Sequence, residues 1–580
     1  MTCIAISRDG TTLASGQITH MGYLAEIILW DISSVMTGEG TPKLINRLRL
    51  HKVQVQALDF SYNGKYLASI GGSDDNNLVI WNVADGKAIC GSPASHDTAL
   101  TCKWMNTSDA HLVTGGTYCL RTWAFDLQAR KVRPTAVGTQ KEVRTFTCIA
   151  INDDDSLIFA GTSTGDVILV SAEKQLMINQ GPQKGSCLGC GVQAIHYVAE
   201  KDEVVVGSGD GELITLDAMS LKPKCVQKVL GAVSSIAMDS QNEFFFVGTE
   251  KSNMYLVQLE GLVAELKTTC HAEMINDIYY PRGYSDLFAT CAGSDIRIWH
   301  SNTLAELLRV QVPNCECNCI AFTPSGTDIV SGWNDGKIRS FFPQSGGLKY
   351  VINEAHRLTG VGNSSGGIVP KNGVTSICPS NDCKRLISGG ADGQVRVWAI
   401  SKGTQVMIAS MKEHKGPVYA ISIKADDSEC VSASADGSCI TWSLSDSHPF
   451  VRINALFAAN FFKSVAYHPD ESQLLTCGTD RKISYWDVLN MNAIRIVDGS
   501  DTADVNSLHV NADGKFFISG GADKKVNLWN YDEGSLYYTG EGHSGAINKV
   551  KISPDEERII SVGAEGGIFI WKVPEDFKSY

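Results

Sequence analysis

The sequence predicts an all-β fold of two tandem β-propellers. Three observations carry this prediction: a repeated motif, period-two alternation within each repeat, and too many repeats for one ring. The motif returns thirteen times in 580 residues, mostly 40 to 47 residues apart. Each copy has small residues, a turn of the Asp-Gly type, and alternating apolar residues that end on an aromatic one. A fixed period of this length indicates a repeat architecture.

The copies differ in how fully they keep the motif. The clearest five read SGGADGQVRVW, SASADGSCITW, TCGTDRKISYW, SGGADKKVNLW and SVGAEGGIFIW, and they end at Trp398, Trp442, Trp486, Trp529 and Trp571. Earlier copies end at Trp30, Trp81, Trp123 and Trp299, and Phe341 takes the place of the Trp in SGWNDGKIRSF. Three further copies, at 159–170, 206–216 and 246–257, keep the turn and the alternation without the Trp.

The tenth repeat shows what one unit is. Apolar residues alternate at Val418 and Ala420, and again around Val431 after a polar break. Period two with frequent turn residues predicts short antiparallel strands. Asp436 and Gly437 supply the positive φ angles of a tight hairpin. About 43 residues then make a four-stranded sheet that needs neighbours on both faces, which radial stacking around an axis provides.

Thirteen units exceed the four to eight blades of one ordinary ring, so two rings are expected. A seven-bladed closure takes the units from Trp299 to Trp571 and leaves six for the first ring. We therefore predict one propeller over 1–270 and a seven-bladed propeller over 271–580. The first ring has six recognisable blades. Either a seventh blade is missing upstream, or the six units are closed by some other strand.

The units resemble WD40 repeats over essentially the whole chain. In the tenth unit the resemblance implies the family's structural hydrogen-bond tetrad of His414, Ser432, Asp436 and Trp442. The Asp orients the His, the His bonds the Ser hydroxyl, and the Ser accepts the indole N–H. A buried polar chain of this kind serves the architecture of the fold when every member is satisfied.

The thirteenth unit nearly repeats this set. It has His543, Ser561 and Trp571, but Glu565 stands where the tetrad has Asp, which changes the geometry of the bond to the His. The ninth, eleventh and twelfth units keep Asp392, Asp480 and Asp523 with their Trp. We interpret all of these groups as structural.

Composition and charge restrict the classes of function. The formal net charge of −13 argues against general affinity for nucleic acid, which needs a concentrated basic face. No apolar run approaches the length of a membrane span, and Met1 leads directly into a strand pattern, so we expect a protein that is neither membrane-inserted nor secreted. The 18 cysteines then fit a reducing compartment.

Signals for catalysis and metal binding are weak. GTSTG at 161–165 and GNSSG at 362–366 match a nucleophile-elbow pattern but lack its strand-to-helix context. Cys187 with Cys190, and the alternating Cys315, Cys317 and Cys319, are the metal candidates, but buried thiols packed between blades explain them better. We predict no catalytic residue, no metal, no cofactor and no small-molecule substrate.

One insertion stands out as a candidate partner-binding loop. Between His356 and Val374 the chain carries LTGVGNSSGGIVPKNG, which lengthens its repeat to 57 residues. A Gly- and Ser-rich loop held by a rigid scaffold is a typical place for recognition. The candidate residues are Thr359, Asn363, Ile368, Val369, Pro370 and Lys371. The alternative is a tolerated surface insertion.

Beyond the repeats, the whole chain resembles the tandem-propeller, cilia- and flagella-associated WD-repeat proteins found among the microtubule inner proteins of axonemal doublets. The phrases that carry this resemblance lie outside the general repeat motif and include FATCAGSDIRIWH, YVINEAHR, SNDCKRLISGG, TCGTDRKISYWDV and GHSGAINKVKISP. The resemblance implies a non-enzymatic protein of the cytoskeleton, located in the B-tubule lumen near the inner junction. It also implies tubulin and neighbouring inner proteins as partners.

Two features depart from that family, and one other class competes with it. The first ring is a blade short of the family pattern, and the insertion after His356 is peculiar to this chain. The alternative is an actin-regulatory tandem propeller of the filament-disassembly cofactor type, which has a similar number of blades. Binding to microtubules or to filamentous actin distinguishes the two.

Overall fold

The chain divides into two compact units. The computed structural model describes residues 1–19, 22–36, 40–139, 144–182, 187–239, 241–356, 373–401, 404–445 and 450–577. Unit 1 is Met1–Thr269 and unit 2 is Cys270–Tyr580. The division falls one residue before the boundary expected from the repeats.

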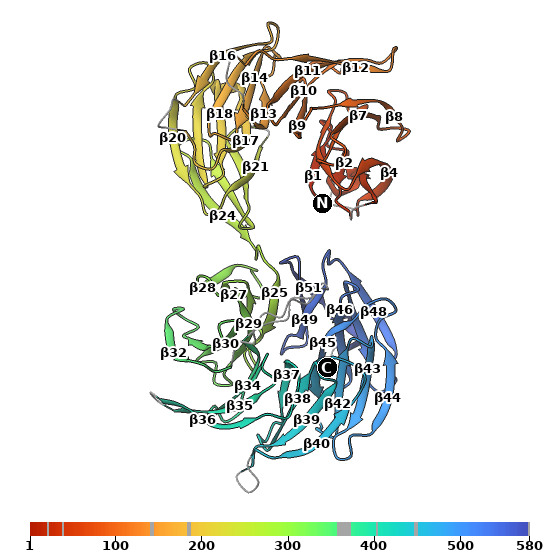
Figure 1. Cartoon of the computed structure of the whole chain (residues 1–580), viewed down its shortest axis with the longest axis vertical. Coiled ribbons are helices and arrows are strands. Elements are labelled where there is room, and N and C mark those ends of the chain that lie inside the picture. The colour runs from red at the N-terminus through yellow and green to blue at the C-terminus, as the bar shows by residue number, and fades with distance from the viewer. Residues whose placement is uncertain are drawn as a thin grey trace. The chain divides into compact units, whose positions relative to one another are not determined.

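Among the described residues, the strands form thirteen antiparallel sheets, one for each sequence repeat (Figure 1). Twelve sheets have four strands and the last has three. The described helices are short: α1 (Ser33–Met36) and the 3-10 helices η1 (Ala199–Lys201) and η2 (Glu575–Phe577). The predicted fold class, all-β with tandem propellers, is confirmed.

Unit 1 contains six sheets, or blades, each made of four consecutive strands with the innermost strand first. The strands are β1 (Cys3–Ile6), β2 (Thr12–Gly16), β3 (Leu24–Asp31) and β4 (Lys43–Lys52); β5 (Val55–Phe60), β6 (Tyr66–Gly71), β7 (Asn77–Asn82) and β8 (Ala88–Pro93); β9 (Ala99–Trp104), β10 (His111–Gly116), β11 (Cys119–Asp126) and β12 (Lys131–Ala136); β13 (Phe146–Ile151), β14 (Leu157–Thr162), β15 (Val167–Ser171) and β16 (Leu176–Gly181); β17 (Val192–Val198), β18 (Glu203–Ser208), β19 (Glu212–Asp217) and β20 (Pro223–Lys228); β21 (Val233–Met238), β22 (Phe244–Thr249), β23 (Asn253–Gln258) and β24 (Val263–Thr269).

Unit 2 contains the remaining seven blades. The strands are β25 (Ile275–Tyr279), β26 (Leu287–Ala292), β27 (Asp295–His300) and β28 (Glu306–Gln311); β29 (Cys317–Phe322), β30 (Ile329–Trp333), β31 (Ile338–Phe341) and β32 (Leu348–Ile352); β33 (Val374–Pro379), β34 (Arg385–Gly390), β35 (Val395–Ser401) and β36 (Thr404–Met411); β37 (Val418–Ile423), β38 (Glu429–Ser434), β39 (Ser438–Ser443) and β40 (Arg452–Phe457); β41 (Phe462–Tyr467), β42 (Gln473–Gly478), β43 (Lys482–Asp487) and β44 (Ala493–Asp498); β45 (Val505–Val510), β46 (Phe516–Gly521), β47 (Lys525–Asn530) and β48 (Leu536–Glu541); β49 (Ile547–Ile552), β50 (Arg558–Gly563) and β51 (Ile568–Lys572).

Each blade is a meander whose strands pair through tight turns. In the tenth blade, Val431 of β38 lies opposite Thr441 of β39, and Gly437 in the connecting turn has a φ of 82°. Glycine adopts this left-handed conformation without a steric penalty. The expectation of a positive φ therefore holds for Gly437 but not for Asp436.

The apolar core lies between neighbouring blades. One cluster joins Ile387 and Val397 of the ninth blade to Cys430 and Trp442 of the tenth. A blade with a neighbour on each side therefore buries both of its faces, as stacked repeats do.

Unit 2 closes into a ring of seven blades. The inner strand of its last blade, β49, packs against the inner strand of its first, β25. Ile275 and Phe288 of the first blade share one buried cluster with Ile560 and Val562 of the last. The seven-bladed second ring expected from the repeats is thus present.

Unit 1 has an open end. Its inner strands pack in order from β1 to β21, and in the described part of the unit no comparable packing joins β21 back to β1 (Figure 1). Ile4 and Ile6 on β1, and Phe244 and Phe246 on β22, are exposed there. Of the two alternatives left open by the repeats, a closed six-bladed ring is not what the described residues form.

Candidate functional site

The four residues assigned to the tenth tetrad meet between strands β38 and β39 and the segment before β37. His414 Nε2 lies 2.7 Å from the Ser432 hydroxyl, which accepts the Trp442 indole N–H at 2.8 Å. His414 Nδ1 lies closer to the Ser438 hydroxyl, at 2.8 Å, than to the Asp436 carboxylate, at 3.4 Å. Ser438 donates to Asp436 at 2.5 Å, so a fifth residue links the carboxylate to the imidazole.

The thirteenth blade brings its four residues together as well. His543 Nδ1 contacts Glu565 directly, and His543 Nε2 lies 2.6 Å from the Ser561 hydroxyl. Ser561 accepts the Trp571 indole N–H at 2.8 Å. The longer Glu side chain reaches the imidazole with Oε1 but leaves Oε2 buried without a hydrogen-bond partner among the described residues. The substitution therefore keeps the contact with the His and leaves one carboxylate oxygen unsatisfied.

Three complete tetrads were missed by sequence reasoning. In each, a His contacts an Asp with Nδ1 and a hydroxyl with Nε2, and the same hydroxyl accepts a Trp N–H at 2.7 to 2.9 Å. The sets are His51, Ser69, Asp75 and Trp81; His271, Thr290, Asp295 and Trp299; and His356, Ser388, Asp392 and Trp398. A His 24 residues before the Asp was the available signal for the first two.

Other blades keep the Trp bond with different partners. In the eighth blade, Phe341 occupies the expected Trp position, and Trp333 instead donates to Ser331 at 2.8 Å from within the second strand. In the twelfth blade, Ser500 takes the place of the His and donates to Asp523 at 2.7 Å. The polar centre of a blade is thus preserved while its residues change.

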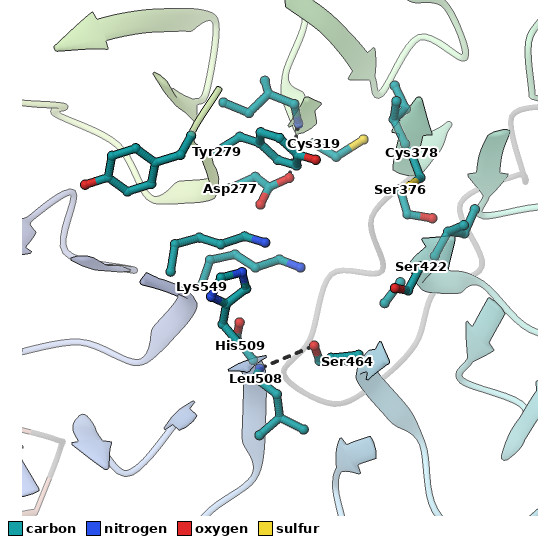
Figure 2. Close-up of a pocket in the computed structure, with 18 of the residues that line it drawn as sticks. Asp277, Tyr279, Cys319, Ser376, Cys378, Ser422, Ser464, Leu508, His509 and Lys549 are labelled. Atoms are coloured by element: carbon teal, nitrogen blue, oxygen red, sulfur yellow. Dashed lines mark hydrogen bonds between the residues drawn. The ribbon is translucent and has the colours of Figure 1, made fainter. Parts of the chain in front are cut away.

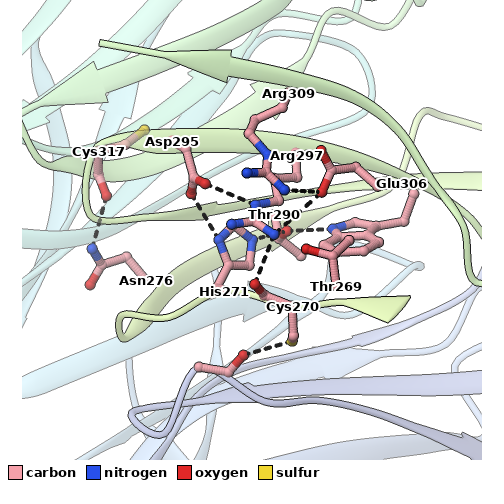
Figure 3. Close-up of polar contacts among 12 residues, drawn as sticks. Thr269, Cys270, His271, Asn276, Thr290, Asp295, Arg297, Glu306, Arg309 and Cys317 are labelled. Atoms are coloured by element: carbon pink, nitrogen blue, oxygen red, sulfur yellow. Dashed lines mark hydrogen bonds and ion pairs between the residues drawn. The ribbon is translucent and has the colours of Figure 1, made fainter. Parts of the chain in front are cut away.

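The tetrad of the first blade of unit 2 extends into a charged network (Figure 3). Asp295 accepts from His271 at 2.8 Å and from Arg297 Nε at 2.8 Å. Arg297 continues to the Cys270 carbonyl at 2.8 Å and to Glu306, which also accepts from Arg309. Buried charges are tolerated when paired in this way.

Burial sets the protonation of these groups. It lowers the pKa of His271, His356 and His414, so their imidazoles are neutral in the fold. Burial would raise the pKa of Asp295, but the hydrogen bond from His271 and the charge of Arg297 bring the pKa below its usual value. A neutral His that donates to an ionised Asp and accepts from a hydroxyl satisfies both ring nitrogens.

The predicted partner-binding loop lies outside the described residues. This holds for Thr359, Asn363, Ile368, Val369, Pro370 and Lys371. The flanking His356 and Val374 are buried, the first in its tetrad and the second in the cluster between the eighth and ninth blades.

The cysteine candidates are dispersed. Cys187 and Cys190 are exposed, whereas Cys317 and Cys319 of β29 are buried, the first in the cluster shared with the seventh blade and the second in the cluster shared with the ninth. Across the part of the chain that the structure describes, no three His, Cys, Asp or Glu side chains are grouped to hold a metal ion. Burial raises the pKa of Cys378 to about 12, so this thiol stays protonated.

No described helix has the length and apolar character needed to cross a membrane.

A cavity of about 840 Å³ occupies the centre of unit 2. All seven inner strands contribute to its wall, and Asp277, Tyr279, Ser376, Ser464, His509 and Lys549 surround it (Figure 2). This cavity is the central channel of the propeller.

Apolar side chains are also exposed on outer strands. On β36 three successive residues, Val406, Met407 and Ile408, are 59%, 48% and 44% exposed. β36 is the edge strand of its sheet, so its outer backbone groups have no paired strand within the blade. An exposed apolar edge is a typical surface for binding another protein.

These features define a WD-repeat protein built as tandem β-propellers. The WD domain, G-beta repeat family matches residues 366–399, 405–443, 458–487, 491–530 and 534–572. The family described as echinoderm microtubule-associated protein first beta-propeller matches residues 1–257.

Whole-chain relatives specify the family further. The chain is 49% identical to cilia- and flagella-associated protein 52 of Chlamydomonas reinhardtii, over 98% of this chain and 89% of the relative. The proteins of the same name from Bos taurus and Homo sapiens are 43% and 42% identical, over 99% of this chain and 88% and 89% of the relatives. The chain belongs to the family of cilia- and flagella-associated protein 52.

Proposed function

We propose that this protein is a non-enzymatic structural component of motile cilia and flagella. It binds tubulin and neighbouring inner proteins inside the B-tubule, near the inner junction, and braces the doublet microtubule during beating. Its relatives are named for cilia and flagella, and the family that matches its first 257 residues is named for a microtubule-associated protein. These names support a microtubule partner over the actin-regulatory alternative.

The observation that carries this proposal is the apolar edge of β36. Val406, Met407 and Ile408 lie on the outer edge strand of a blade whose centre is held by the Trp398–Ser388 bond of its tetrad. A rigid block with exposed apolar edges suits a brace, because it can hold contacts at fixed spacing and gain from their combined effective concentration.

The test is co-assembly with tubulin. Purified protein is present during tubulin polymerisation or is added afterwards, and the pellet is compared with a pellet of filamentous actin. Luminal binding predicts much more protein in the microtubule pellet when it is present during polymerisation. Equal recovery in both orders of addition contradicts the luminal site, and recovery with actin alone supports the alternative function.

A variant pair then tests the surface. Replacing Val406, Met407 and Ile408 by Ser should reduce co-assembly without lowering the melting temperature, because these side chains are exposed. The matched control replaces Ile494 and Ile496 of β44, which are equally exposed on another blade, by Ser. Loss of co-assembly in both variants, or in neither, rejects β36 as the contact.

The insertion is a second proposed contact. Deleting Thr359 to Lys371 should leave folding intact, because the deletion spares the tetrad residue His356 and the core residue Val374. If the loop binds a partner, incorporation into axonemes decreases. Unchanged incorporation identifies it as a tolerated insertion.

A further inference from the structure

The central channel of unit 2 contains two lysines that contact no carboxylate among the described residues. Lys549 and Lys551 lie on the inner strand of the last blade, and both line the cavity. Within the described part of the chain, neither ammonium group has a hydrogen-bond or carboxylate partner, and Lys551 Nζ lies 5.2 Å from the ring centre of Tyr279. Burial, with the nearby charge of Lys549, lowers the pKa of Lys551 to about 8.

The acidic groups of the cavity wall form their hydrogen bonds with other residues, although the charge of Asp277 still acts on Lys551 and partly opposes the effect of burial on its pKa. Asp277 accepts the backbone N–H groups of Ile278 and Ile320, at 3.0 and 3.1 Å. Glu556 accepts from Ala512 N at 2.8 Å and from Asn511. Burial also raises the pKa of Cys378 and of Tyr279, so neither is an anion. The two lysines therefore add positive charge to the channel of a chain whose net charge is −13.

His509 adds a hydrogen-bond donor, its Nε2–H group, to the cavity wall. Its Nδ1 accepts the backbone N–H of Ile552 at 3.2 Å, so in the neutral imidazole the proton is on Nε2. Burial and the charge of Lys551 lower the pKa of His509 well below its usual value, which keeps the ring neutral. Figure 2 shows His509 and Lys549 on the same side of the cavity, opposite Ser376 and Ser422.

Lys463, the third lysine of the cavity wall, differs from Lys549 and Lys551 because its ammonium group is paired. Lys463 donates to Asp504 and to Asn506, both at 2.8 Å. Among the described residues Lys549 and Lys551 have no such arrangement, and Lys551 has only the cation–π contact with Tyr279. Desolvating an ammonium group without an ionic partner is costly. An anion in the channel would remove that cost.

We propose that the central channel of unit 2 binds a phosphate-bearing small molecule, held by Lys549, Lys551 and the Nε2–H group of His509. Lysine ammonium groups are common phosphate ligands, and an anion between two of them forms charge-assisted hydrogen bonds. The volume of about 840 Å³ lies within the 300 to 1,000 Å³ typical of small-molecule sites and admits a molecule with several phosphate groups. The ligand is a bound component and not a substrate, and the site is independent of the proposed contacts with tubulin.

Isothermal titration calorimetry of the full chain in phosphate-free buffer at about 150 mM salt tests this proposal. The probes are inorganic phosphate, inositol hexakisphosphate and a glutamate hexapeptide. We expect one inositol hexakisphosphate per chain, weaker binding of inorganic phosphate, and no binding of the peptide. Tighter binding of inorganic phosphate than of inositol hexakisphosphate would identify free phosphate as the source. Binding of the peptide alone would overturn the proposal in favour of an acidic protein partner.

Variants of Lys549 and Lys551 test whether these two residues bind the anion. Lys549→Gln with Lys551→Gln should weaken inositol hexakisphosphate about 100-fold, at about tenfold for each charge-assisted bond. The control Lys482→Gln removes an exposed lysine of the same unit and should bind normally. The single variant Lys551→Met removes a buried charge, so it should fold even if the double variant does not, and it should bind about tenfold more weakly. No binding by the unmodified protein, or equal binding by Lys551→Met, overturns the site.

Discussion

Asn548 in the last blade of unit 2 donates its side-chain N–H to the carbonyl of Ile275 in the first blade, at 2.8 Å, across 273 residues of sequence. The same bond recurs between neighbouring inner strands, from Asn276 to Cys317, from Asn318 to Val374 and from Asn506 to Ile547. The junction that closes the ring therefore uses the same side-chain bond as three other junctions of unit 2.

Replacing Asn548 by Ala should open this junction. The Ile275 carbonyl loses its side-chain partner at a buried position, which costs about 1 to 3 kcal/mol in the free energy of unfolding. Urea unfolding of the full chain measures the effect. Asn454 is the matched control, because it also donates to a carbonyl of the next blade, Leu489 at 2.9 Å, but in an exposed place. A comparable loss in Asn454→Ala would show that the position in the ring does not matter.

Substitutions of Trp442 test whether the tetrad of the tenth blade stabilises the fold. Trp442→Ala should cost about 3 to 5 kcal/mol, because it leaves a cavity in the cluster between two blades and removes the donor to Ser432. Trp442→Phe keeps most of the packing and should cost less. The control is Phe457→Ala in the same blade, where the side chain is 74% exposed and removal should change stability by under about 0.5 kcal/mol. A melting curve of Trp442→Ala like that of the unmodified protein would contradict the structural role.

Acid should destabilise unit 2 at mildly low pH. The pKa values of His271, His356 and His414 are lowered from 6.5 by burial, so the unfolded chain binds protons that the folded chain does not. The free energy of unfolding is then highest above pH 6.5 and falls as the pH drops below it. Thermal unfolding between pH 7.5 and 5 measures this slope. A melting temperature that stays constant across that range would show that these imidazoles are not buried as neutral groups.

Binding in the channel should also depend on pH. Lys551 faces Asp277, Tyr279, Lys549, His509 and Cys378, and its pKa is about 8 because burial disfavours its charge. An anion prefers the protonated lysine, so affinity for inositol hexakisphosphate should fall between pH 7 and pH 9. Calorimetry at the two pH values tests this, and Lys551→Met should lose the decrease. A decrease of the same size in Lys551→Met would assign it to another group.

Much of the architecture could be predicted from the sequence because each repeat is specified by residues that are close together along the chain. Turns such as Asp436-Gly437 and the alternation around them identify each blade without reference to the rest of the chain. The tetrad of the ninth blade was not predicted in full, because the insertion separates His356 from Asp392 by 36 residues. In the thirteenth blade, His543 and Glu565 are only 22 residues apart. The hydrogen bond from Trp333 to Ser331 was not predicted, because both residues lie on the same strand and not at the usual positions of the repeat.

The channel could not be predicted from the sequence for a different reason. Lys549 and Lys551 read as the polar positions of an ordinary alternating strand. Only the closed ring brings them beside His509 of the preceding blade and Asp277 of the first. For unit 1, the repeat count indicated a ring one blade short, but β1 and β21 each have the pattern of a normal inner strand, so the sequence did not decide between an open end and closure by another strand.

The most direct measurement is fractionation of motile cilia that carry a tagged copy of this protein. Demembranated axonemes are extracted with high salt, and the doublet microtubules are separated from the extract. A luminal brace should stay with the doublets and be released only when the doublet wall is dissolved. Recovery of the protein in the detergent or salt extract, with none left on intact doublets, would contradict its role as a microtubule inner protein.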